Sequence, residues 1–126
     1  YPLRRQRQMC IRDSLSAKGE INEVGANDMY NPWYNVLVKE GTGTLQYQGK
    51  WNLFDQIIMT PNLLNKDGKK DFSELKFWKN QIFRRDYLFQ ESGKYKGNTK
   101  RTTAGGVWLD GYSDHLPVVT YFVKQQ

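Results

Sequence analysis

Hydrophobic and polar residues alternate most clearly in the middle of the chain. Residues 42–48 follow the two-residue period of a half-buried strand, and the run 51–60 is mostly apolar. Gly49 and Lys50 form the break between these runs, and Pro61 follows the second one. Because glycine favours turns and proline ends a strand, this pattern predicts a β-hairpin.

The pattern elsewhere is shorter and mixed. Pro32 precedes a series that favours a short helix, since proline suits the first helical turn. Over residues 75–88 the periodicity does not decide between helix and strand. Residues 15–24 are predicted to be the end of a helix, with Gly19 as its C-cap, followed by an extended segment. The other predicted elements are a helix over 33–39, a polar loop over 65–71, a strand over 77–83, a short helix over 84–89, a basic loop over 92–106 and a strand over 118–123.

Length and composition indicate one folded domain. The chain has 126 residues, of which 38% are hydrophobic and 14% aromatic, enough for one modest, β-rich core. No run approaches the roughly 18 apolar residues of a membrane-spanning helix. We therefore expect a soluble chain without a membrane segment, and secretion or a periplasmic location stays open.

Basic charge is concentrated at the start of the chain. The formal net charge is +6, and residues 1–14 contain four arginines against one aspartate. This stretch has neither strand alternation nor an amphipathic stripe, and it resembles translated sequencing-adapter sequence. A basic nucleic-acid-binding arm is the alternative. We predict that residues 1–14 are non-native or disordered and that residues 15–126 form the domain. Cys10, the only cysteine, lies outside that domain, so nothing supports disulfide or thiolate chemistry.

The most informative chemistry lies near the C-terminus, in Ser-Asp-His-Leu-Pro-Val over residues 113–118. Its histidine, His115, is the only one in the chain. Neighbouring residues of a strand point to opposite faces, so a joint role for Asp114 and His115 requires a turn, which Gly111 and Pro117 favour. A loop at the mouth of a strand often presents catalytic groups. The plain alternative is a hydrogen-bonded surface corner.

A second acidic residue lies in the predicted second strand. Asp55 is flanked by Leu53-Phe54 and by Ile57-Ile58. A carboxylate buried in such surroundings must be paired or hydrogen-bonded, because burial without a partner costs several kcal/mol. The alternative is an aspartate on the solvent side of an alternating strand.

Two strings together resemble a known superfamily. Gly-Tyr-Ser-Asp-His-Leu-Pro-Val-Val over residues 111–119 resembles the C-terminal signature of the endonuclease/exonuclease/phosphatase superfamily, and Phe54-Asp55-Gln56-Ile57 is similar to a second pattern of it. The resemblance implies an α/β (α+β) fold, the C-terminal part of a four-layer α/β sandwich with two packed, mostly antiparallel sheets. It also implies phosphoester hydrolysis with His115 as acid/base, Asp55 orienting the imidazole and Asp114 at a metal site holding Mg²⁺ or Mn²⁺.

The resemblance covers only the later part of that domain. Its upstream metal-binding glutamate and Gly-Asp-x-Asn pattern are not found in this sequence. One carboxylate is too few for Mg²⁺, which requires several oxygen ligands. We therefore expect that the N-terminal half of the domain is missing, that these 126 residues alone are inactive, and that the intact parent protein is an enzyme.

Substrate signals are weaker than the catalytic ones. Arg101, Trp51 and Tyr112 are candidate substrate-binding residues, because basic groups attract phosphates and aromatic rings stack on bases. The leading hypothesis is an endonuclease that cleaves phosphodiester bonds, with nucleic acid as its substrate. The alternatives are a lipid or inositol phosphate phosphatase of the same superfamily and a non-catalytic basic module that binds nucleic acid.

Overall fold

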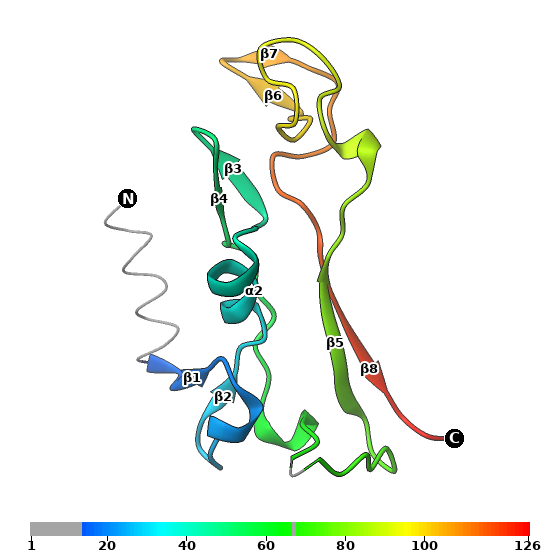
Figure 1. The fold of residues 1–126 in the computed structure, drawn as a ribbon. Coiled ribbons are helices and arrows are strands. Elements are labelled where there is room, and N and C mark those ends of the chain that lie inside the picture. The colour runs from blue at the N-terminus through cyan, green and yellow to red at the C-terminus, as the bar shows by residue number, and fades with distance from the viewer. Residues whose placement is uncertain (1–13, 67) are drawn as a thin grey trace. The chain divides into compact units, whose positions relative to one another are not determined.

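The structure is a computed structural model that describes residues 14–66 and 68–126 and combines short strands with few helices (Figure 1). The mixed α/β class predicted from the sequence is confirmed. The strands are β1 (Ala17–Lys18), β2 (Met29–Tyr30), β3 (Leu45–Tyr47), β4 (Lys50–Asn52), β5 (Lys76–Ile82), β6 (Thr103–Ala104), β7 (Val107–Trp108) and β8 (Val118–Val123). The helices are α2 (Trp33–Glu40) and the 3-10 helices η1 (Ile21–Glu23), η2 (Pro61–Leu63) and η3 (Asp86–Leu88).

The chain divides into two compact units. Unit 1 takes the described residues up to Asn35 together with Gln56–Asn80 and Thr120–Gln126, and unit 2 takes Val36–Asp55 and Gln81–Val119. Within the described residues, strands pair as β1–β2, β3–β4, β5–β8 and β6–β7. The first pair is parallel, whereas β3–β4 and β6–β7 are antiparallel.

Unit 1 is organised around apolar side chains. Its buried cluster consists of Val24, Tyr30, Met59 and Leu64, with Ile21, Leu63, Phe77 and Phe122 packed against it. The rings of Tyr30 and Phe77 meet edge to face, with centroids 5.5 Å apart, a favoured aromatic geometry. Backbone hydrogen bonds in both directions between Tyr30 and Met59 hold the two segments that supply this core.

Trp33 opens helix α2 and is fully buried. Its backbone N–H donates to the Asn31 side-chain oxygen (3.1 Å), and its indole N–H donates to the Ile57 carbonyl oxygen (3.2 Å). Asn31 thereby accepts one of the N–H groups that the first turn of a helix leaves without an intrahelical partner. The predicted helix over residues 33–39 is confirmed.

Unit 2 contains the predicted hairpin, but its strands are shorter than expected. The turn is at Gln48 and Gly49 and not at the predicted Gly49 and Lys50, because Lys50 already pairs with Tyr47. The φ angles of Gln48 and Gly49 are 49° and 74°, the positive values that a two-residue hairpin turn requires. The second strand ends at Asn52 and does not continue to residue 60. The reason is local: the N–H groups of Phe54 and Asp55 donate to the Thr44 hydroxyl, so they do not extend a strand ladder.

Three other predicted elements require correction. Residues 15–24 hold strand β1 and helix η1 in place of a helix end, because Lys18 lies against Tyr30 in a parallel pair and its carbonyl accepts the Asn31 N–H. The helix predicted over 84–89 is only the single 3-10 turn η3. The basic loop over 92–106 is partly ordered, since its last residues form β6.

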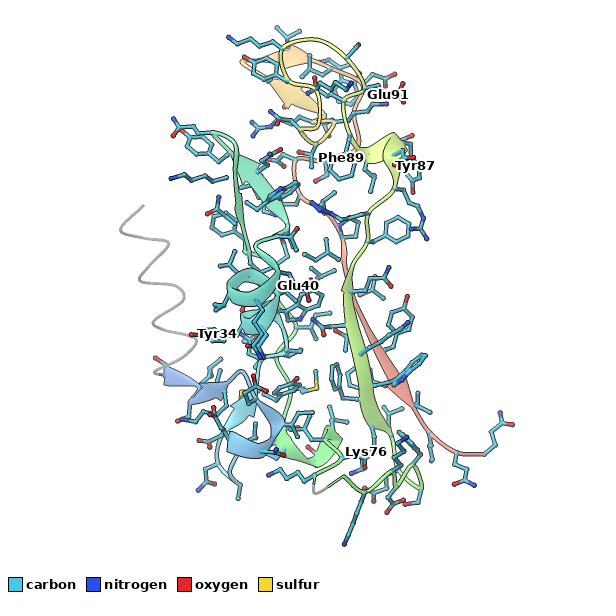
Figure 2. All side chains as sticks on the ribbon, in the orientation of Figure 1. Tyr34, Glu40, Lys76, Tyr87, Phe89 and Glu91 are labelled. Carbon is cyan, nitrogen blue, oxygen red and sulfur yellow. The ribbon has the colours of Figure 1, made fainter. Side chains whose placement is uncertain are left out.

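The two long strands agree with the prediction. β5 and β8 cover residues 76–82 and 118–123 and run side by side in opposite directions (Figure 1). Figure 2 draws the side chains on the same ribbon, where Lys76 marks the first residue of β5. Among the described residues, no helix is long and apolar enough to cross a membrane.

Candidate active site

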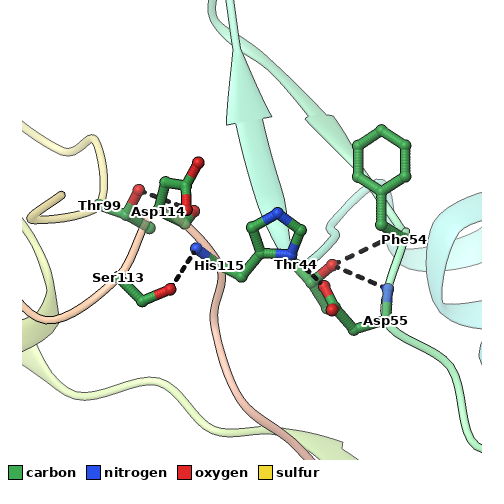
Figure 3. A network of polar contacts seen from close by, with 7 residues as sticks. All are labelled: Thr44, Phe54, Asp55, Thr99, Ser113, Asp114 and His115. Carbon is green, nitrogen blue, oxygen red and sulfur yellow. Dashed lines mark hydrogen bonds and ion pairs between the residues drawn. The ribbon is translucent and has the colours of Figure 1, made fainter. Parts of the chain in front are cut away.

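The sequence-predicted pair of Asp55 and His115 is formed in unit 2 (Figure 3). The imidazole Nδ1 of His115 lies 2.6 Å from the Asp55 Oδ2, although the two residues are 60 positions apart in the sequence. The side chains are 39% and 37% exposed, respectively. Asp55 is therefore neither an unpaired buried carboxylate nor a simple surface residue: it is bound to the only histidine of the chain.

A single buried threonine holds the two segments that carry the pair. The hydroxyl oxygen of Thr44 accepts the backbone N–H groups of Phe54 (3.2 Å) and Asp55 (3.4 Å). The Thr44 carbonyl oxygen accepts the N–H of Leu116 (2.7 Å), the residue after the histidine. Because Thr44 is fully buried, its polar groups require partners within the protein, and these partners are the backbones on both sides of the site.

Glycine at position 43 permits this arrangement. A Cβ atom there would lie 2.3 Å from the Asn52 carbonyl oxygen, so only glycine allows the two hairpin strands to approach this closely. The N–H of Thr44 donates to that same oxygen at 2.8 Å. Gly43 thus fixes where Thr44 lies and, through it, where the site is formed.

The backbone of His115 is fixed on two sides. It forms a β-bridge to Leu45, and its N–H donates to the Ser113 hydroxyl at 3.0 Å. The ring lies 6.1 Å from the Phe54 ring, in a tilted arrangement. Leu116 is buried directly after it, so the imidazole extends from an anchored segment of backbone.

This geometry determines what the imidazole can do. An ionised carboxylate only accepts hydrogen bonds, so the Nδ1 of His115 donates its proton to Asp55. In the neutral ring the other nitrogen, Nε2, then carries the free lone pair. Figure 3 shows Nε2 on the side of the ring that faces away from Asp55. In this arrangement Nε2 is the ring nitrogen that can accept a proton.

Asp114 lies beside this pair but is not part of it. Its backbone carbonyl accepts the hydroxyl of Thr99 (3.0 Å), and in Figure 3 its side chain lies on the side of Thr99, apart from Asp55. Within residues 14–66 and 68–126, no three His, Cys, Asp or Glu residues are grouped so as to hold a metal ion. One carboxylate does not satisfy a hard divalent cation, which requires several oxygen ligands, so these residues do not make up a magnesium site.

The three candidate substrate-binding residues all lie in unit 2. Tyr112 is exposed and immediately follows Gly111. A Cβ at Gly111 would lie 2.2 Å from the Arg101 carbonyl oxygen, so glycine allows the backbones of these two segments to touch. Trp51 is in a different environment, because the Arg84 guanidinium lies over its ring, 4.4 Å from the centroid. The structure therefore brings Arg101 and Tyr112 together near Asp114, whereas Trp51 packs against Arg84.

Sequence reasoning missed Thr44 and Arg84. In the sequence, Thr44 is one more alternating residue of a predicted strand. Arg84 donates to the Thr42 hydroxyl at 3.2 Å, and burial lowers the pKa of its guanidinium. Its Nε is buried with no hydrogen-bond partner among the described residues, a feature that only the structure could reveal.

Comparison with known proteins places the chain in a family. Neither the curated proteins nor the solved structures contain a match to it. A sequence model described as the Endonuclease/Exonuclease/phosphatase family matches residues 5–124. The match begins inside the basic N-terminal segment; residues 1–13 lie outside the described residues, so the prediction that this segment is non-native remains a prediction. Because the match covers nearly the whole sequence, the chain belongs to the endonuclease/exonuclease/phosphatase family.

Proposed function

We propose that this chain carries the general-base histidine of an enzyme that hydrolyses phosphodiester bonds. We further propose that this enzyme is an endonuclease. The observation that carries the proposal is the 2.6 Å contact between His115 Nδ1 and Asp55 Oδ2 in a member of the endonuclease/exonuclease/phosphatase family. Members of that family are in general hydrolytic enzymes, typically dependent on divalent metal ions.

In the proposed reaction, His115 Nε2 takes a proton from a water molecule as its oxygen attacks the phosphorus atom. The bond from phosphorus to the leaving oxygen breaks, the leaving oxygen takes a proton from solvent and ends as a hydroxyl group, and the imidazolium returns its proton to solvent. Asp55 keeps the Nδ1 proton in place and stabilises the imidazolium that forms. Both side chains are partly exposed, so water can reach the ring.

Asp114 is proposed as one oxygen ligand of a Mg²⁺ or Mn²⁺ ion. The described residues do not complete such a site, so we assign no step of the reaction to the metal. This shortage predicts that the 126 residues by themselves turn over little or no substrate. The phosphodiesterase activity is proposed for the chain together with any coding sequence that precedes it in its gene.

Cleavage of a nucleic acid is favoured over the alternatives by charge and aromatic content. Residues 15–126 keep a net charge of +3, which attracts polyanions, and the exposed Tyr112 lies two residues before Asp114. A lipid or inositol phosphate phosphatase of the same family would use the same His115–Asp55 pair. A non-catalytic nucleic-acid-binding module would depend on neither residue.

The test is a nicking assay on supercoiled plasmid with Mg²⁺, performed on the chain alone and on the chain with any preceding coding sequence. We expect turnover only from the longer protein, and we expect His115→Ala to reduce the rate at least about 100-fold, the lower range for general-base catalysis. Asp55→Asn should also reduce the rate, because an amide does not hold the Nδ1 proton as a carboxylate does. Its matched control is Asp86→Asn, at an exposed acidic residue of unit 2.

Three other results would contradict the proposal in different ways. Equal nicking by wild type and His115→Ala in the longer protein would refute the role of the histidine. Turnover by the 126 residues alone that is lost in His115→Ala would keep that role but refute the shortage of metal ligands. Phosphate release from inositol phosphates without plasmid nicking would favour the phosphatase.

A further inference from the structure

A surface of tyrosine and basic side chains adjoins the candidate active site in unit 2. Residues 98–102 are hydrogen-bonded through the backbone to two other segments of unit 2, one on each side. On one side, the Lys100 N–H donates to the Leu88 carbonyl at 2.8 Å, and on the other side the Ser113 N–H donates to the Lys100 carbonyl at 3.1 Å. Lys100 and its neighbour Arg101 are therefore held between η3 and the segment that leads to Asp114.

Two tyrosines flank this central segment. Tyr87 belongs to η3, and Tyr112 lies two residues before Asp114. Their rings meet edge to face, with centroids 5.4 Å apart and an interplanar angle of 69°. The residues are 47% and 64% exposed. The pair is thus ordered by its own contact while much of its aromatic surface remains open to solvent.

Basic side chains accompany the tyrosines. Residues 92–106 contain Lys94, Lys96, Lys100 and Arg101 and no acidic residue. The Lys100 ammonium lies 4.0 Å from the Glu91 carboxylate, and a solvent-exposed ion pair of this kind holds its partners only weakly. We define the tyrosine–basic surface as Tyr87, Tyr112, Lys100 and Arg101. It is tied to the candidate site because Thr99, next to Lys100, donates its hydroxyl to the Asp114 carbonyl.

We propose that the tyrosine–basic surface binds single-stranded nucleic acid, with an unpaired base stacked on Tyr112, whose ring Tyr87 contacts edge to face, and phosphates bound by Lys100 and Arg101. This inference rests on the proposed function and specifies its substrate. Aromatic rings interleaved with cations are the combination that binds single strands, because every base has a face that can stack and every nucleotide has a phosphate. A duplex already stacks its bases on one another, so its faces are closed to the tyrosines.

The lysine content favours this occupant over a protein. Tyrosine and arginine are also enriched in protein interfaces, but lysine is depleted there, and residues 92–106 contain three lysines. A polyanion with repeating charges complements residues 92–106, which contain only positive charges.

The test measures binding of a fluorescent oligothymidine of about 12 nucleotides, within the site sizes of single-strand binders, by anisotropy. The full 126-residue chain is used in EDTA, so that hydrolysis does not interfere. We expect tighter binding of the oligothymidine than of a duplex of equal length. Tyr112→Ala should weaken single-strand binding about tenfold, whereas Tyr112→Phe should leave it unchanged because the ring remains.

Two controls separate stacking from charge and from folding. Tyr34→Ala removes a tyrosine that is 49% exposed and belongs to unit 1, and it should not change binding. Arg101→Gln should reduce the slope of the logarithm of the binding constant against the logarithm of salt concentration by about 0.7, the value for one phosphate contact on a single strand. If Tyr112→Ala fails to fold, the salt dependence of binding by Arg101→Gln still tests the proposal.

The contrary results are equally specific. The inference is wrong if Tyr112→Ala weakens duplex and single-strand binding alike, or if Arg101→Gln leaves the salt slope unchanged. Binding to vesicles of anionic phospholipid that displaces the oligonucleotide and is lost in Tyr112→Ala would assign the surface to a membrane instead. Binding is measured in EDTA without turnover, so failure of this inference is distinguishable from failure of the proposed catalysis.

Discussion

The two units of this protein are stabilised by different kinds of buried groups. In unit 1 the buried side chains are apolar or aromatic, apart from Asn31: Val24, Tyr30, Trp33, Met59 and Leu64. In unit 2 two threonines are buried together with three leucines: Thr44 and Thr99 with Leu53, Leu88 and Leu116. The apolar core gives unit 1 non-directional stabilisation, whereas the threonines of unit 2 act through directed hydrogen bonds.

This difference gives a physical reason for the candidate active site to be formed in unit 2. A catalytic pair must be held at a defined distance and angle, and hydrogen bonds supply a direction that apolar contacts do not. Thr44 binds the backbone on the aspartate side and on the histidine side of the pair, and Thr99 binds the backbone of Asp114. Each threonine therefore positions one part of the candidate site.

The largest expected effect tests the apolar character of unit 1. Trp33→Ala removes a fully buried indole and its hydrogen bond to Ile57. The loss of packing and the cavity that remains should lower the free energy of unfolding by about 3–5 kcal/mol, as measured by urea denaturation.

A matched tryptophan provides the control for that experiment. Trp78 also lies in unit 1 but is 58% exposed, and its ring contacts Tyr121 and Lys79. Trp78→Ala should cost less than about 1 kcal/mol, as for most surface substitutions. Equal costs for the two tryptophans would contradict the assignment of the unit 1 core.

An intermediate effect tests the hydrogen bonds of unit 2. Thr44→Val preserves the shape of the side chain but removes the oxygen that accepts the Phe54 and Asp55 N–H groups. Leaving such groups without a partner costs about 1–3 kcal/mol. We expect that reduction in the free energy of unfolding, measured by the same urea titration.

Thr102, which is only partly buried, is the control for Thr44. Its hydroxyl donates to the Tyr112 carbonyl at 3.0 Å, but water can replace this partner, so Thr102→Val should change stability by no more than about 0.5 kcal/mol. If Thr44→Val were as mild as Thr102→Val, the view that buried threonines organise unit 2 would be refuted.

The same contrast explains what the sequence could predict. Helix α2 and strands β5 and β8 follow from apolar periodicity and from Pro32, which are local signals. The contact of Asp55 with His115 was predicted from the family resemblance of two short strings. Local periodicity alone could not have given it, because residues 60 positions apart meet only through the tertiary fold.

Other features carried no local signal at all. The second strand of the hairpin was predicted too long because residues 53–60 are apolar, yet the Thr44 hydroxyl takes the N–H groups at 54 and 55. The same alternation that predicted a strand at Thr44 gave no sign that this residue is buried. Tyr87 and Tyr112 likewise lie 25 positions apart, in a 3-10 turn and a loop, and only the structure brings their rings together.

The smallest expected effect concerns the position of one proton in unit 2. In neutral His115 the Asp55 carboxylate should hold the proton on Nδ1, because a carboxylate cannot donate. Asp55→Asn introduces an amide that can donate to Nδ1 in its turn, which moves the proton to Nε2 and removes the free lone pair from that nitrogen.

Since the chain has a single histidine, one long-range ¹H–¹⁵N correlation spectrum in alkaline buffer reports the tautomer directly. We expect the Nδ1–H form in wild type and in Asp86→Asn, and a shift toward Nε2–H in Asp55→Asn with little change in stability. An Nε2–H tautomer in the wild-type protein would show that Asp55 does not hold the proton on Nδ1. The claim that directed hydrogen bonds organise the candidate site of unit 2 would then be refuted.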